Sequence, residues 1–137
     1  VGPRGSKHAP EGADAFVLVV DGTALPSAAA WIRAAGSRRA TVFVSSAADA
    51  DLARDYLASV DATPSGIQVH DGTGHDIPVE EGTFVFAAGE ATSLIPIRAA
   101  LRARGLPAAQ FVVSGYWRRG VTAFDHHSPL DPSQPDD

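Results

Sequence analysis

Short apolar runs alternate with amphipathic stretches along most of the chain. The continuous run at residues 16–20 is rich in β-branched side chains, which is typical of a strand buried on both faces of a sheet. Residues 26–36, which follow it, are rich in alanine and end on a glycine, as helices often do. Repeated along the chain, this alternation predicts strands at residues 16–20, 41–44, 67–70, 83–87 and 110–114, and helices at residues 26–36, 49–60 and 91–104.

The order of these elements predicts an α/β fold. Strands that alternate with helices indicate βαβ units, so we expect a Rossmann-like three-layer sandwich around a mostly parallel five-stranded sheet. The link at residues 71–82 is polar and too short for a good crossover helix. It therefore marks a return to the centre of the sheet and predicts the strand order 3-2-1-4-5. In the last helix, Pro96 predicts a kink or a later helix start.

The chain has 137 residues, which is enough for one ordinary domain. Residues 1–12 carry glycine, proline and charge without periodicity and are expected to form a linker-like arm. Residues 13–124 contain all the predicted elements. Residues 125–137 carry three prolines and few apolar side chains, so we expect a disordered or loosely draped tail.

Composition excludes several classes of protein. The chain has no cysteine, which rules out disulfides, thiol nucleophiles and iron–sulfur ligation. Its net charge of −5 argues against a nucleic-acid-binding surface. No apolar run approaches the ~18–20 residues of a membrane span, and no secretory signal is visible, so we expect a cytoplasmic protein. A homodimer is left open.

Three loops should converge where the strand order reverses, beyond the carboxyl ends of the first and fourth strands. Two of them contain a glycine and open a helix, so their backbone N–H groups could bind a pyrophosphate. A glycine turn is also an ordinary strand–helix connection, and neither GxGxxG nor GxxxxGK[ST] is present. These two loops are made of Asp21, Gly22 and Thr23, and of Ala88, Gly89 and Glu90.

The third loop follows the fifth strand and holds an aromatic pair, Tyr116 and Trp117, followed by Arg118 and Arg119. In one interpretation the aromatic rings cap the end of the sheet and the arginines are solvated. In the other, the rings cover a planar ligand and the guanidinium groups reach a phosphate or carboxylate. The residues alone leave both interpretations open.

Four stretches of the sequence resemble the C-terminal domain of siderophore-interacting proteins, which are flavin- and NAD(P)H-dependent ferric-siderophore reductases related to ferredoxin–NADP reductases. The two most specific are AGEATSLIPIRAALRARGL at residues 88–106 and FVVSGYWRRG at residues 111–120. VDGTALPSAAAWI at residues 20–32 resembles the family's GDETALPAI segment, and GPRGS at residues 2–6 resembles its interdomain linker.

The resemblance implies that residues 13–124 bind NADPH or NADH. Asp21 and Thr23 would line the pyrophosphate or ribose, and residues 88–90 would lie near the nicotinamide. Tyr116 and Trp117 would face the flavin. Catalysis would belong to the cofactors.

The resemblance also implies a partner. FAD would be held by a barrel domain that 137 residues cannot contain, so that domain is expected in cis or in trans. Ferric siderophore would be reached only through the flavin. The chain alone is therefore expected to bind nucleotide without turnover.

Two departures from the family pattern keep alternatives open. Val20 and Gly22 replace a glycine and a glutamate of the family's turn, and Val20 could block the approach of a pyrophosphate. Ser45 and Ser46 could meet a 2′-phosphate, yet two aspartates nearby, at positions 49 and 51, would repel it. The choice between NADPH and NADH therefore stays open, as does a stand-alone, degenerate binding or dimerisation module without redox activity.

Histidine-containing segments give weaker signals. Adjacent His126 and His127 are poorly arranged to ligate one metal ion, so a metal site there is disfavoured. The segment with His70, Asp71, His75 and Asp76 is more typical of a solvated turn. We therefore expect no metal site.

Overall fold

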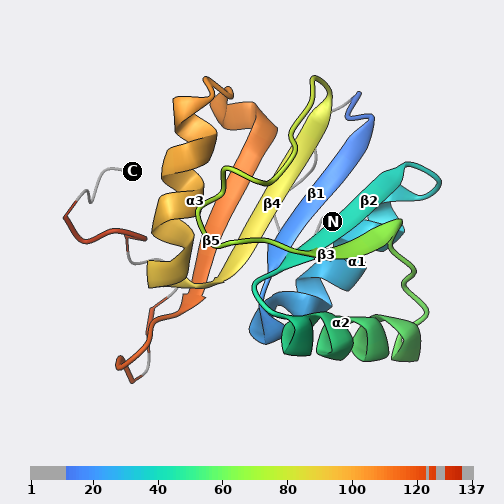
Figure 1. Cartoon of the computed structure of the whole chain (residues 1–137), viewed down its shortest axis with the longest axis horizontal. Helices are drawn as coiled ribbons and strands as arrows, with labels where there is room; N and C mark the ends of the chain where they lie inside the picture. The colour runs from blue at the N-terminus through green and yellow to red at the C-terminus, as the bar shows by residue number, and fades with distance from the viewer. Residues whose placement is uncertain (1–11, 123, 126–128, 134–137) are drawn as a thin grey trace.

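The computed structural model describes residues 12–122, 124–125 and 129–133, and its centre is a five-stranded parallel sheet with the order β3-β2-β1-β4-β5 (Figure 1). This confirms the predicted fold class and strand order. The strands are β1 (Ala15–Val20), β2 (Arg39–Val44), β3 (Gly66–Val69), β4 (Thr83–Glu90) and β5 (Phe111–Trp117). The helices are α1 (Leu25–Ala35), α2 (Ala47–Ser59) and α3 (Ala91–Ala103), with short 3₁₀ turns η1 (Gly22–Ala24) and η2 (Ala108–Gln110).

Helices cover both faces of the sheet, as the alternation of β1 side chains requires. Phe16 and Leu18 point into the core beneath α1 and α2, where Trp31 packs 5.1 Å from Phe84 between ring centroids. Val17 points into the opposite core, beneath α3. Every residue of β4 is buried, because this strand lies inside the sheet between β1 and β5.

The link between β3 and β4 contains no helix, in agreement with its polar sequence. In Figure 1 it crosses the sheet towards α3 before it returns to β4. Arg104 holds it there by donating hydrogen bonds to the carbonyl oxygens of Ile77 (2.6 Å) and Gly74. Gly74 has a positive φ of 83° and lies against Ala100, so no larger residue would fit. The buried Ile77 side chain completes the core beneath α3.

Strands β4 and β5 both continue beyond their predicted ends. Residues 88–90, predicted as a turn, are the last residues of β4, and Glu90 pairs with Trp117 of β5 after an irregularity in the register. Gly89 allows this close approach, because its φ is 147° and a Cβ atom would lie 2.6 Å from the Asp21 carboxylate. The longer strands carry Glu90 and Trp117 to the same edge of the sheet.

Helix α3 starts directly after β4, so of the two alternatives that Pro96 predicts, the later helix start is wrong. Glu90 fixes the start by accepting hydrogen bonds from the backbone N–H groups of Thr92 and Ser93. Pro96 lies inside the helix on its exposed side.

Part of the predicted tail packs against the domain. Leu130 is buried in the core beneath α3, and Arg118 donates to the carbonyl oxygens of Pro129 (3.3 Å) and Leu130 (2.6 Å). For residues 129–133 this differs from the expectation of a disordered tail, because one apolar side chain finds a place in the core. The arm before Gly12 and the pair His126 and His127 lie outside the described residues.

None of the helices in the described part of the chain has the length and hydropathy required to cross a membrane.

Candidate functional site

A cleft of about 360 Å³ opens where the strand order reverses, at the carboxyl ends of β1 and β4. This is the position at which open α/β sheets bind ligands. Among the residues that the sequence predicts for the site, its lining includes Asp21, Ser45, Ala88, Gly89, Glu90 and Trp117.

The cleft has two sides of different chemistry. One, here called the β4–β5 side, is formed by Asp21, Glu90, Trp117 and Arg119; the other, the β2–β3 side, is formed by Ser45, Asp49, His70 and Gly72. Apolar residues line the space between them: Val19, Val20, Leu94 and Ile97.

Asp21 connects the ends of three strands on the β4–β5 side. Its Oδ1 accepts hydrogen bonds from the backbone N–H (3.0 Å) and the hydroxyl of Thr23. Its Oδ2 accepts from the backbone N–H of Glu90 (2.9 Å) and from the indole Nε1–H of Trp117 (3.0 Å). The side chain is half-buried. Asp21 therefore fixes β4 and the exit of β5 relative to β1.

Glu90 is the second carboxylate on this side, and only 6 % of its surface is exposed. It accepts hydrogen bonds from three backbone N–H groups, those of Thr92 (3.1 Å), Ser93 (2.9 Å) and Arg119 (3.1 Å). Burial alone would raise the pKa of Glu90, but these hydrogen bonds outweigh it and lower the pKa to about 2. Glu90 is therefore charged at neutral pH and caps the N-terminus of α3.

The two carboxylates occupy the backbone donors on which the predicted pyrophosphate contact relied. The N–H groups of Thr23, Thr92 and Ser93 all donate to the chain's own side chains. A pyrophosphate at these helix starts would meet negative charge instead of unpaired amides. The contact of Asp21, Gly22 and Thr23 with a pyrophosphate stays a prediction, and neither Gly22 nor Thr23 lines the cleft.

The two arginines after Trp117 have different surroundings. Arg118, the predicted site residue, turns away from the cleft: it donates to the Thr92 hydroxyl (3.2 Å) and holds the segment at Leu130. Arg119 lines the cleft instead, with its guanidinium carbon 5.8 Å from the centre of the Trp117 ring. Of the two arginines that the sequence offers for a phosphate or carboxylate, the structure therefore places only Arg119 at the cleft.

The aromatic pair is likewise divided. Trp117 lines the cleft, whereas Tyr116 packs against the core beneath α1, where its hydroxyl lies 2.6 Å from Oγ of Ser27. Ser46 is not in the lining either. It caps α2 by accepting a hydrogen bond from the backbone N–H of Asp49 (3.1 Å).

His70 lies on the β2–β3 side and was not predicted as a site residue. It is 7 % exposed, and its Nδ1 accepts a hydrogen bond from the backbone N–H of Gly72 (3.0 Å). Burial lowers its pKa, against the opposing effect of Asp76 and Asp71, so the ring is neutral near pH 7. The expectation of a solvated turn is therefore wrong for His70, whereas Asp71, His75 and Asp76 are exposed.

The described residues contain no group of three or more carboxylate or histidine side chains that could hold a metal ion. What the cleft offers a ligand is polar and charged side chains on two sides and an apolar wall between them.

Comparison with known proteins identifies the family. A model of the siderophore-interacting protein family matches residues 13–120. The structure of a siderophore-interacting protein from Acinetobacter baumannii matches with a TM-score of 0.63 and 21% identity, over 90% of this chain and 54% of that one.

A second solved structure shares the fold. The flavohem-like FAD/NAD-binding domain of nitric oxide dioxygenase from Vibrio cholerae O1 biovar El Tor matches with a TM-score of 0.53 and 14% identity, over 79% of this chain and 54% of that one. A search of curated proteins found no significant match. The chain thus spans about half the length of the two solved structures. Because the family model covers most of the sequence, the chain belongs to the siderophore-interacting protein family.

Proposed function

We propose that this domain binds a pyridine nucleotide, NADPH or NADH, in the cleft and presents its nicotinamide to a flavin. The observation that carries the proposal is the cleft of about 360 Å³ at the carboxyl ends of β1 and β4, in a member of this family. Its volume falls within the range of roughly 300–1,000 Å³ typical of small-molecule sites. The flavin would be held by a barrel domain, either in the same polypeptide or in a separate one.

The chemistry of the lining suits a ring better than it suits a phosphate. Val19, Leu94 and Ile97 give an apolar wall for a planar group, with Trp117 beside it. Arg119 supplies the positive charge for an anionic part of the ligand, and it is the one arginine or lysine among the described lining residues. The nucleotide therefore fits if its phosphates lie between the two sides of the cleft, away from the capped helix starts and within reach of the long Arg119 side chain.

The β4–β5 side also suits the expected reaction. When bound, the nucleotide would supply a hydride to the flavin, whose electrons would then reduce the ferric siderophore. Asp21 and Glu90 place two carboxylates at the cleft. They would stabilise the positive charge that a nicotinamide gains when it gives up hydride, since preorganised charges act most strongly where charge develops.

The proposal is tested by calorimetric titration of the chain with NADH and with NADPH. We expect binding by at least one nucleotide, weakened several-fold by Arg119→Ala. The matched control is Arg39→Ala, an exposed arginine at the opposite end of the sheet, which should leave binding unchanged. Absence of binding by either nucleotide at millimolar concentration would contradict the proposal.

A second candidate function is favoured by one observation: Asp21 and Glu90 occupy the donors at the helix starts. In that case the domain would be a binding or dimerisation module without redox activity. An assay with nucleotide, flavin, ferric siderophore and the barrel domain separates the two functions. Electron transfer that requires both domains supports the reductase module, whereas nucleotide binding without electron transfer supports the alternative.

A further inference from the structure

We propose that the cleft selects NADH over NADPH, and that Asp49 on the β2–β3 side makes this selection. The inference rests on the proposed nucleotide-binding function and narrows it to one cofactor. It concerns the first turn of α2, which follows β2 directly and contributes Asp49 to the cleft.

The strand order places Asp49 beside the adenosine half of a bound dinucleotide. β2 neighbours β1 in the sheet, on the side away from β4. A nicotinamide over the carboxyl end of β4 therefore directs the adenosine ribose towards the end of β2, as in other doubly wound folds. Ser45 and Asp49 are the residues after β2 that line the cleft there.

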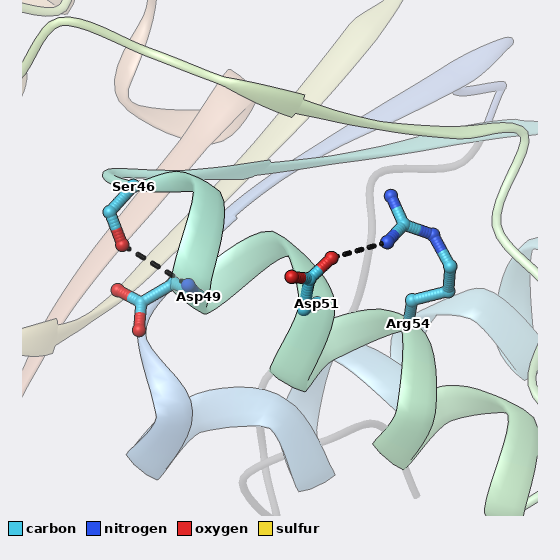
Figure 2. A network of polar contacts seen from close by, with 4 residues as sticks. All are labelled: Ser46, Asp49, Asp51 and Arg54. Carbon is cyan, nitrogen blue, oxygen red and sulfur yellow. Dashed lines mark hydrogen bonds and ion pairs between the residues drawn. The ribbon is translucent and has the colours of Figure 1, made fainter.

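The backbone of Asp49 is fixed, whereas its carboxylate makes one long contact and keeps room for a ligand. Its backbone N–H donates to Oγ of Ser46 at 3.1 Å (Figure 2). Oγ of Ser45 lies 3.4 Å from Oδ2 of Asp49. Within the described part of the chain, Asp49 forms no ion pair. The N-terminal dipole of α2 favours a negative charge at this position.

The one arginine or lysine of α2 is engaged elsewhere. Arg54 of α2 pairs with Asp51 at 2.9 Å, and Figure 2 shows its guanidinium reaching the Asp51 carboxylate. Both members of this pair are largely exposed, and neither lines the cleft. Of the two aspartates that the sequence suggests would repel a phosphate, the structure therefore leaves only Asp49 at the cleft.

These contacts distinguish the two cofactors chemically. A carboxylate accepts hydrogen bonds from the two ribose hydroxyls of NADH. The 2′-phosphate of NADPH replaces one of these hydroxyls with negative charge and offers Asp49 no donor at neutral pH. Neutral His70 can donate a hydrogen bond on this side but supplies no compensating charge, and Arg119 lies on the other side of the cleft.

The test measures dissociation constants of the chain for NADH and NADPH, in the unmodified protein and in two variants. We expect NADH to bind at least about tenfold more tightly. Asp49→Asn should narrow this ratio about tenfold, mainly by improving NADPH binding, because the amide removes the negative charge. Asp51→Asn is the matched control, since it makes the same change in charge two residues further along α2 and should leave the ratio unaltered.

Several outcomes would overturn the inference. It fails if the unmodified chain binds the two nucleotides equally or prefers NADPH, or if both variants change the ratio alike, which would indicate a general effect of net charge. In all these cases the proposed nucleotide-binding function survives. If neither nucleotide binds to any of the three proteins, both proposals fail. Thermal denaturation of the variants checks that each is folded.

Discussion

The two sides of the cleft differ in how their polar groups are satisfied. On the β4–β5 side, Asp21 and Glu90 accept hydrogen bonds from backbone groups, from Trp117 and from neighbouring hydroxyls. On the β2–β3 side, Ser45 and Asp49 make one long contact with each other, at 3.4 Å. His70 uses only Nδ1 in the hydrogen bonds of the described residues.

This difference separates structural from ligand-binding roles. A polar group whose hydrogen bonds are complete stabilises the fold but gains little from a ligand. A polar group with unused hydrogen-bonding capacity gains more. Substitutions of Asp21 and Glu90 should therefore mainly lower stability, whereas substitutions on the β2–β3 side should mainly alter binding.

The largest loss in the free energy of unfolding is expected for Glu90→Gln. The pKa of Glu90 is lowered from 4.5 to about 2 in the folded protein. Its stabilising contribution is therefore complete above about pH 4.5 and is lost as the pH falls towards 2. A shift of this size corresponds to roughly 3 kcal/mol at neutral pH. Urea denaturation at several pH values should show this loss at pH 7 and a flatter dependence of unfolding free energy on pH between 5 and 2. An equally steep dependence in the variant would show that Glu90 is not the group responsible.

The second largest loss of stability is expected for Asp21→Ala, which leaves the donors of Glu90, Trp117 and Thr23 without their acceptor. Because the side chain is half-buried and water can reach part of the gap, we expect a loss of about 2 kcal/mol in the free energy of unfolding. The control Asp51→Ala removes an exposed carboxylate and should change stability by about 0.5 kcal/mol or less. Tryptophan fluorescence should report the altered surroundings of Trp117. A stability equal to that of the control would place Asp21 among the ligand-binding groups instead.

Much of this arrangement could be predicted from sequence patterns. The polar link at residues 71–82 was sufficient to predict the strand order, and the strand order placed the cleft. The place of Asp21, Glu90 and Trp117 at the cleft could then be predicted, because these residues stand at the carboxyl ends of three strands that meet at one edge of the sheet. These predictions depend on periodicity and connectivity, which sequence records directly.

What could not be predicted depends on tertiary contacts. The run of apolar residues in β4 stops before Gly89, so the sequence indicates a turn where the strand in fact continues. Only that continuation brings Glu90 to the N–H of Arg119 and turns Arg118 away from the cleft. The burial of His70 likewise depends on the path of the link that follows β3.

A smaller loss of stability is expected for Tyr116→Phe. The phenol hydroxyl lies 2.6 Å from Oγ of Ser27 on the α1 face of the sheet, outside the cleft. Removing it should lower the free energy of unfolding by about 1 kcal/mol. Nucleotide affinity should stay the same, although the sequence resemblance places Tyr116 near the cofactors. Calorimetric titration with NADH checks this. Weaker binding without loss of stability would show that Tyr116 acts on the ligand and not only in the packing beneath α1.

The smallest effect on stability is expected for Ser45→Ala, on the β2–β3 side. Ser45 is exposed and its hydroxyl contributes only the 3.4 Å contact with Asp49, so the free energy of unfolding should change by about 0.5 kcal/mol or less. The same hydroxyl lines the cleft, and its loss should weaken NADH binding roughly threefold, as expected for one hydrogen bond of modest strength. Ser59→Ala is a control, because that hydroxyl bonds to the carbonyl oxygen of Tyr56 at the far end of α2. If Ser45→Ala lowered stability and left binding unchanged, the β2–β3 side would have the same structural role as the β4–β5 side, and the distinction between them would be lost.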